Sequence, residues 1–317
     1  MEMLFKGTKA VSALTKTALA CTTLCTVLLT SPVANALDVV IIIDTTGSTG
    51  ALLPNWQARM QEEVIDQFRL ADPHTRFSLA SHLDFPFSPY GGTDEYAYRL
   101  DAQLDSNTEP FILALNNLDS GWGGDGPESQ LEALYQVTTG HGRDLNNNGS
   151  FLDQGDISPT NTGFNDNSPS IVIHFTTPAV FHNEPFEPNY PYSGVINPPA
   201  DFDSALTAMI SKNVIYYQVE PNALPSIMGS EKTIMDHQMQ QPLSVSLQQA
   251  KMAVAATPGE RLAEATGGDV LHVGSDLSGL AEAIEDIVED VRPCPAGQVP
   301  VYLPWATYCV PDHGDKE

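Results

Sequence analysis

The chain has 317 residues, with 14 Lys+Arg against 40 Asp+Glu and a formal net charge of −26 at pH 7. Such an acidic protein is a poor partner for nucleic acid or anionic lipid, because both would repel it. The length suits one large domain, or one domain with insertions.

Residues 1–36 are typical of a secretory signal peptide. Three lysines precede an apolar stretch from Ala18 to Leu29, and Ala34-Asn35-Ala36 is a small-x-small cleavage site. We expect cleavage after Ala36 and a protein that is secreted, periplasmic or held at the cell surface. The apolar run is short for a spanning helix, and no later stretch is long enough, so no membrane insertion is expected after cleavage. Cleavage would remove three lysines and one glutamate and leave a net charge of −28.

Beyond the signal peptide, predicted strands alternate with predicted helices. Val39–Ile43 is a run of five β-branched apolar residues and indicates a buried strand. Further strands are predicted over 76–83, 96–104, 171–175, 214–219 and 269–273. Helices are predicted over 55–70, 108–118, 127–137, 201–211, 244–256, 260–266 and 277–291. This alternation predicts an α/β fold with a doubly wound, mostly parallel central sheet and helices on both faces.

Two long irregular segments interrupt the pattern, at 140–170 and 183–199, and both are expected in surface connections, where function often lies. We expect one domain over 37–292, with 140–170 as an inserted loop, and a short Pro-rich tail over 293–317. Cys294 and Cys309 lie in that tail. In an exported protein they are expected to form a disulfide, with a free thiol or an intermolecular bridge as the alternatives.

The first strand ends in the motif Asp44-x-Thr46-x-Ser48. Open α/β sheets bind their ligands at the carboxyl ends of strands. One carboxylate and two hydroxyls supply hard oxygen ligands with little negative charge, which suits Mg²⁺, Mn²⁺ or Ca²⁺ and leaves the metal electrophilic. The alternative is a helix cap in which the hydroxyls bond backbone amides.

The order of elements resembles a von Willebrand factor A domain, and Asp44-x-Thr46-x-Ser48 resembles the first loop of its metal-ion-dependent adhesion site. The C-terminal end of the predicted domain is also similar to that of this family, because Leu262–Gly268 is followed by a strand and an amphipathic helix. Asp125-Gly126-Pro127-Glu128 resembles the Asp-x-Pro-Glu of the A-like domain of integrin β subunits, and His82–Pro86 is similar to that family's Phe-Val-Asp-x-Pro. The resemblance covers about residues 37 to 292.

The resemblance implies two neighbouring cation sites. Mg²⁺ or Mn²⁺ would be held at a primary site by Asp44, Thr46, Ser48 and Glu128. Ca²⁺ would be held at a second site by Asp84, Asp125, the Pro127 carbonyl and Glu128. For Asp84 and Asp125 the alternative is that of ordinary turn residues flanking Pro and Gly.

The chain also departs from the integrin pattern. Pro178 stands where integrins carry a metal-binding aspartate, and a proline side chain is no ligand. Thr49–Leu52 replaces the paired acids of the integrin third site. These departures leave open a degenerate primary site.

The segment 144–156 resembles a calcium-binding loop. Oxygen side chains recur at alternate positions, Gly149 stands at the sixth position for the sharp turn, and Gly155 occupies the twelfth instead of glutamate. The candidate Ca²⁺ ligands are Asp144, Asn146, Asn148, Ser150, Asp153 and Asp156. The alternative is a solvated loop rich in Asn and Gly.

The expected function is a divalent-cation-dependent adhesion module that binds a protein partner through the partner's acidic side chain. A calcium-ordered structural scaffold is the first alternative. A hydrolase is less favoured: Asp44-Thr45-Thr46-Gly47 only superficially matches the Asp-Thr-Gly of aspartic proteases, which are all-β with two similar halves. His82, His174 and His182 have no evident nucleophile partner, so packing or surface roles are expected for them and no enzyme activity is predicted.

Overall fold

The computed structural model describes residues 36–165, 170–177, 180–185, 190–221 and 257–291, and the backbone of 298–303 and 306–311. Residues 1–35 of the predicted signal peptide, Pro178, Cys294 and the helix expected over 244–256 lie outside these ranges, as does the side chain of Cys309. Within the described residues, none of the helices has both the length and the apolar character that crossing a membrane requires.

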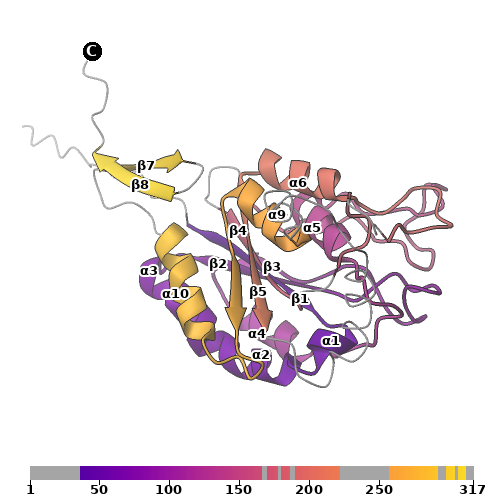
Figure 1. The fold of residues 1–317 in the computed structure, drawn as a ribbon, viewed down its shortest axis with the longest axis horizontal. Coiled ribbons are helices and arrows are strands. Elements are labelled where there is room, and N and C mark those ends of the chain that lie inside the picture. Colours follow the sequence, from indigo (N-terminus) through magenta and orange to yellow (C-terminus); the bar gives the residue numbers. More distant parts are fainter. Residues whose placement is uncertain are drawn as a thin grey trace, which may run out of the picture. The chain divides into compact units, whose positions relative to one another are not determined.

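A mostly parallel sheet forms the centre of the domain (Figure 1). Its strands run in the order β3-β2-β1-β4-β5-β6. β1 pairs in parallel with both β2 and β4, and only the edge strand β3 is antiparallel to its neighbour. The strands are β1 (Asp38–Asp44), β2 (Arg76–His82), β3 (Arg99–Asp105), β4 (Ser170–Phe175), β5 (Val214–Pro221) and β6 (Val270–Val273). The predicted α/β fold class is confirmed.

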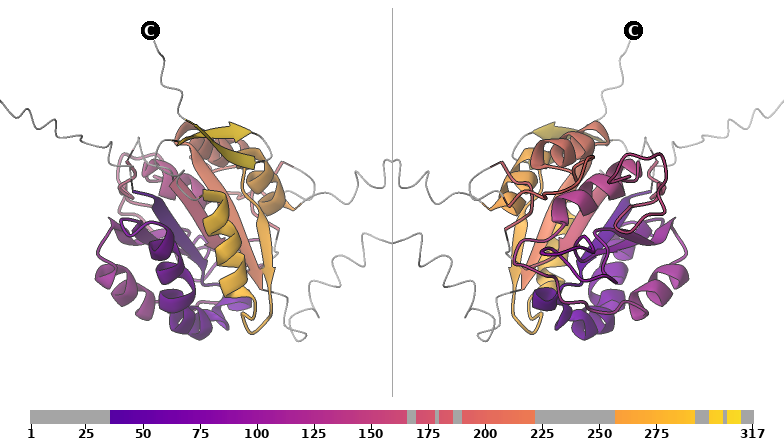
Figure 2. Two further views of the ribbon diagram at one scale, coloured as in Figure 1. Left: turned by 90° about the vertical axis from the view of Figure 1, so that its left-hand side faces the viewer. Right: turned by 90° about the vertical axis from the view of Figure 1, so that its right-hand side faces the viewer.

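Helices cover both faces of this sheet (Figures 1 and 2). Their bounds are α1 (Gly47–Gly50), α2 (Leu53–Arg59), α3 (Asp66–Ala71), α4 (Glu109–Asn116), α5 (Gln130–Thr139), α6 (Phe202–Ser211), α9 (Pro258–Thr266) and α10 (Leu280–Val291). Side chains of β1 alternate between two cores, because successive residues of a strand point to opposite faces. Val39, Ile41 and Ile43 pack with α2, α3, α4 and α10, whereas Val40 and Ile42 pack with α5, α6 and α9.

The strand order makes the end of β1 a topological switch point. The chain passes from β1 to β2 on one side of the sheet centre and later enters β4 on the other side of β1. In open α/β sheets, ligands bind beyond the carboxyl ends of the strands at such a point. Asp44 is the last residue of β1 and therefore lies at the switch point.

Two predicted helices differ in detail from the observed ones. The helix expected over 55–70 is divided by the π-helical segment Met60–Ile65. The helix expected to begin at Pro127 begins at Gln130, because the Ser129 hydroxyl donates instead to the carbonyls of Leu83 and Ala97, each at 2.8 Å. Pro127 and Glu128 are thereby held in the connection before α5.

The C-terminal tail, in which no strand was predicted, contains an antiparallel pair formed by β7 (Gln298–Leu303) and β8 (Ala306–Pro311). Its many β-branched and aromatic residues favour strands and explain the difference. The disulfide between Cys294 and Cys309 stays a prediction.

Candidate metal centre

The carboxylate of Asp44 is fully buried and held by four hydrogen bonds. Its Oδ1 accepts from the backbone N of Thr46 at 2.9 Å and from the Thr46 hydroxyl at 2.7 Å. Its Oδ2 accepts from the hydroxyls of Thr176 at 2.7 Å and Thr49 at 3.2 Å. The orientation of Asp44 is therefore fixed by the first loop and by the end of β4 together.

A row of hydroxyls continues from this carboxylate. Ser48 Oγ lies 3.4 Å from Thr46 Oγ1 and 3.1 Å from Thr177 Oγ1. Thr46 is the N-cap of α1 by position, yet its side chain makes no capping bond. The hydroxyls face side chains instead of backbone amides, which favours the ligand interpretation of the motif over the helix cap. Thr177 was not singled out from the sequence.

Glu128 lies next to this group with an unsatisfied carboxylate. The residue is 4% exposed, and its Oε2 has no hydrogen-bond partner within the described part of the chain. Burial and the negative charges of Asp44, Asp84 and Asp125 raise the pKa of Glu128 to about 11. A cation shared with these groups would relieve that repulsion, so the residues fit a divalent ion.

The loop before Glu128 is shaped to admit that carboxylate. Gly123 has a φ of +65°, and a Cβ there would lie 2.5 Å from Glu128 Oε1. Glu95, another residue that the sequence analysis missed, accepts from the backbone N of Trp122 and of Gly123, both at 3.1 Å. Its negative charge also contributes to the raised pKa of Glu128. Glu95 follows an irregular segment without a motif, so no sequence signal marked it.

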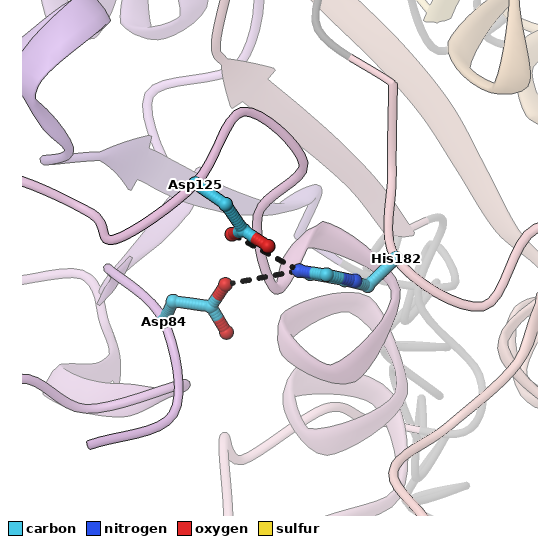
Figure 3. Close-up of side chains that lie close together, drawn as sticks. All are labelled: Asp84, Asp125 and His182. Atoms are coloured by element: carbon cyan, nitrogen blue, oxygen red, sulfur yellow. Dashed lines mark hydrogen bonds and ion pairs between the residues drawn. The ribbon is translucent and has the colours of Figure 1, made fainter. Parts of the chain in front are cut away.

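The second predicted site contains a histidine. Figure 3 shows the ring of His182 pointing its Nε2 toward Asp84 and Asp125. The Nε2 lies 3.3 Å from Asp84 Oδ2 and 3.4 Å from Asp125 Oδ1, and one ligand atom from each residue lies within 4.8 Å of the others. Asp84 and His182 are buried, whereas Asp125 is exposed. Pro127 is buried close by in the chain, and a ligand role of its carbonyl stays a prediction.

The sequence analysis assigned His182 to packing or to the surface. The structure brings it to the predicted second site because the segment after β4 forms an isolated bridge between Phe181 and Glu128. In that bridge the backbone N of His182 donates to the Glu128 carbonyl at 3.2 Å. A contact of this kind depends on tertiary structure, so no local sequence pattern predicts it.

Opposing effects set the charges of this cluster. Burial lowers the pKa of His182, but the contacts of its ring with the Asp125 and Asp84 carboxylates outweigh burial and raise the pKa to about 9. Burial raises the pKa of Asp84, and the contacts with His182 and Tyr192 oppose that shift. Asp84 Oδ1 accepts from Tyr192 Oη at 2.5 Å and from the backbone N of Phe85 at 2.6 Å.

The other two histidines pair inside the fold. His82 Nε2 and His174 Nε2 lie 2.9 Å apart, and His174 Nδ1 lies 3.2 Å from the Tyr216 hydroxyl. Both histidines are fully buried. Their contacts match the packing role expected from the sequence.

The predicted calcium loop is closed by its own side chains. The side-chain amides of Asn146 and Asn148 donate to Asp153 Oδ2 at 2.9 and 2.7 Å. Asp144 accepts from the backbone N of Asn148 at 3.2 Å and of Gly149 at 2.6 Å.

The other two candidate ligands complete the same turn. Asp156 accepts from the backbone N of Leu145 at 2.9 Å and of Asp153 at 3.1 Å. The backbone N of Ser150 donates to Asn148 Oδ1 at 2.8 Å. All six candidate calcium ligands thus belong to one hydrogen-bonded turn, and the bound Ca²⁺ stays a prediction.

Comparison with solved structures gives a distant likeness of fold. No protein-family model matches the chain, and no curated protein matches it. A solved structure described as von Willebrand factor type A from Catenulispora acidiphila is similar with a TM-score of 0.41 and 12% sequence identity. The match covers 85% of this chain and 48% of that chain, so this chain spans about half the length of the structure that it matches. At this distance the function has to be inferred from the site itself.

Proposed function

We propose that this protein is an exported, von Willebrand factor A-like module of the integrin β type that binds a protein partner in a divalent-cation-dependent way. Mg²⁺ or Mn²⁺ at Asp44, Thr46, Ser48 and Glu128 would engage an acidic side chain of the partner. The observation that carries the proposal is the meeting of the ordered Asp44 carboxylate, the hydroxyl row and the unpartnered Glu128 at the carboxyl end of β1.

The ligand set explains why the ion would still bind an outside carboxylate. Hydroxyls are neutral, so Thr46 and Ser48 leave most of the cation's charge uncompensated. Ser48 is only partly buried, whereas Asp44 and Thr46 are fully buried. The exposed side of the site is therefore the side of Ser48, where an acidic group of a partner would approach.

The surface beside the site offers further contacts for a partner. Trp122 is 88% exposed, and its carbonyl accepts from the backbone N of Gly47 at 3.1 Å in the first loop. Trp122 also lines a groove of about 490 Å³, together with Glu95, Tyr96 and Asp119, among others. Because exposed tryptophans are frequent binding hot spots and the chain is strongly acidic, a partner with a basic rim around its acidic group would fit best.

A calcium-ordered scaffold without partner binding is the second candidate. The turn that joins Asp144, Asn146, Asn148 and Asp153 favours this scaffold function. The hydrogen bonds of the turn are made within 144–153 and involve none of the residues around Asp44. We propose Ca²⁺ for this turn under either function. A binding role is proposed in preference to catalysis, since His82 and His174 hydrogen-bond to each other.

Calorimetric titration of Mg²⁺ and Mn²⁺ into chelator-stripped protein tests the primary site. The Asp44→Ala variant should lose one binding event, while the control Asp203→Ala, at an exposed position in α6, should keep it. Identical titrations of the wild type and Asp44→Ala would contradict a metal at Asp44.

A random displayed peptide library tests partner binding. Peptides selected in Mg²⁺ and released by chelator should carry Asp or Glu, and binding should vanish when that acid becomes Asn or Gln. Trp122→Ala should weaken capture, by more than about 1 kcal/mol for a hot-spot residue. Peptides that bind Asp44→Ala equally well in chelator would refute the adhesion function and leave the scaffold.

A further inference from the structure

The cluster of Asp84, Asp125 and His182 has a ligand chemistry different from that of the primary site. We infer that these three residues bind a first-row transition metal, with Zn²⁺ as the best fit, instead of the Ca²⁺ that the integrin resemblance implies. The inference does not depend on the proposed adhesion function, since it concerns metal binding in the absence of any partner.

The distances within the cluster favour a shared ion. Charge-assisted hydrogen bonds between nitrogen and carboxylate oxygen are about 2.7–2.9 Å long. The contacts of His182 Nε2 with Asp84 and Asp125 are longer, at 3.3 and 3.4 Å. Ligands held about 2.1 Å from a tetrahedral Zn²⁺ lie about 3.4 Å apart. The two contacts of His182 Nε2 match this spacing, and the three ligand atoms all lie within 4.8 Å of one another.

The imidazole is oriented in the way that metal-binding histidines are. Nδ1 of His182 is hydrogen-bonded to the backbone carbonyl of Tyr190, which leaves Nε2 for the carboxylates. Such a bond from the other ring nitrogen fixes the orientation of a ligating histidine. The ring also packs against Tyr192, with ring centroids 4.1 Å apart, and against Tyr90, at 5.2 Å. These contacts hold His182 Nε2 in position in the absence of a metal.

The buried carboxylate of Asp84 is a second, independent observation that favours a bound cation. The residue is 0% exposed, and its Oδ1 is satisfied by Tyr192 and by the backbone of Phe85. Its Oδ2 lies 3.3 Å from His182 Nε2 and accepts no regular hydrogen bond in the described ranges. A buried carboxylate oxygen without such a partner is costly, and coordination to a cation would remove that cost.

The donor types decide which cation fits. Imidazole nitrogen suits Zn²⁺ and other transition metals, whereas Ca²⁺ and Mg²⁺ take oxygen ligands. Asp125 is exposed, so the metal can enter from its side, and a water molecule can complete the coordination there.

The experiment is a titration of chelator-stripped protein with Zn²⁺, and in parallel with Co²⁺, whose visible absorption reports nitrogen and oxygen ligation. The wild type should bind one Zn²⁺ that depends on this cluster. His182→Gln and Asp125→Asn should each weaken that binding by more than about 10- to 100-fold, the loss seen when only an outer-shell partner is removed. The control His272→Gln changes a histidine with a 62% exposed side chain in β6 and should bind Zn²⁺ as the wild type does.

Zn²⁺ binding that survives both His182→Gln and Asp125→Asn would overturn the inference, and so would the absence of Zn²⁺ binding by the wild type. Asp125 is exposed, so its substitution should leave the fold intact even if His182→Gln proves unstable. Asp44→Ala should retain the Zn²⁺ site. Loss of Mg²⁺ binding in Asp44→Ala with Zn²⁺ binding intact would show that the two sites are separate, so failure of one proposal is distinguishable from failure of the other.

Discussion

At the scale of single residues, Glu128 links the two candidate sites. It is buried, and its Oε2 has no hydrogen-bond partner among the described residues. The negative charges of Asp44, Asp84 and Asp125 all raise its pKa. A carboxyl in such surroundings keeps its proton when no cation is present. The same residue would stabilise the protein with metal bound and cost stability without it.

Glu128→Gln should therefore stabilise the metal-free protein, increasingly so at higher pH. The pKa of Glu128 is about 11 in the folded state, against 4.5 for an unperturbed glutamate. The stability that the protonated Glu128 contributes is fully present below pH 4.5 and is lost as the pH rises toward the folded-state pKa of about 11. Glutamine has no proton to lose, so the melting temperature of Glu128→Gln should exceed that of the wild type by a few degrees near pH 9, because about 1 kcal/mol shifts it by roughly 2–4 °C.

Thermal unfolding in chelator between about pH 5 and about pH 9 measures this effect. Glu109→Gln, an exposed change in the first turn of α4, is the control and should follow the wild type. In Mg²⁺ the order should reverse, since the variant lacks a ligand. A difference between Glu128→Gln and the wild type that does not grow with pH would contradict the buried, protonated carboxyl.

The residues that sequence alone could find are those that are close together in the chain. Asp44, Thr46 and Ser48 form one turn, so a motif reveals them. Thr177 and His182 reach the same region only through the placement of the end of β4 and the bridge from Phe181 to Glu128. Such placement depends on long-range packing, which has no local signature.

At the scale of elements, α5 holds both long irregular segments in place through one buried carboxylate. Glu132 accepts from the Arg143 guanidinium at 3.1 and 3.0 Å. It also accepts from Gln136 Nε2 at 2.7 Å and from the backbone N of Ala200 at 2.5 Å. Arg143 immediately precedes the candidate calcium turn, and Ala200 directly follows the segment 183–199, which contains Tyr192.

Glu132→Ala should lower the free energy of unfolding by about 3–5 kcal/mol, because it leaves the Arg143 charge half-buried and unpaired. The matched control Glu63→Ala removes the partner of Arg59 in a partly exposed pair and should cost at most about 1 kcal/mol. Denaturant unfolding measures both, and limited proteolysis should show faster cleavage within 140–165 in Glu132→Ala. Equal small losses in the two variants would refute the anchoring role of α5.

Asp153→Ala should abolish Ca²⁺ binding by the 144–156 turn, because the side chains of Asn146 and Asn148 both converge on Asp153. Protection of the turn from proteolysis by Ca²⁺ is the measurement, and the remote change Asp203→Ala is the control. Protection that persists in Asp153→Ala would show that Ca²⁺ acts elsewhere on the chain.

The elements themselves were predictable where one periodicity dominates. The buried run of β1 and the alternation of strands and helices led to the observed sheet. The observed ends of helices differ from the predicted ones where long-range hydrogen bonds compete with local helix propensity. Ser129 is the example, because its hydroxyl contacts the carbonyls of Leu83 and Ala97 just before α5 begins. Likewise, no periodicity in 55–70 distinguishes the π-helical turn between α2 and α3.

At the scale of the whole molecule, the parallel sheet explains why the candidate sites lie together. β1, β2 and β4 run in parallel, so Asp44, Asp84 and Thr177, which end or follow them, emerge at one edge. The result is a concentration of carboxylates in a chain that is already strongly acidic. Any cation could stabilise such a protein simply by screening, so specific and general effects must be separated.

Mg²⁺ should raise the melting temperature of the wild type beyond what NaCl of matched ionic strength achieves. A ligand that binds only the folded state adds about 2.7 kcal/mol to the free energy of unfolding when its concentration is 100 times Kd. In a domain of this size, each kcal/mol raises the melting temperature by roughly 2–4 °C. Asp44→Asn should lose this specific part and keep the screening part, because its overall charge changes by only one unit from −26. If Mg²⁺ stabilises Asp44→Asn as much as the wild type, the cation effect belongs to the acidic surface as a whole and not to a site at the end of β1.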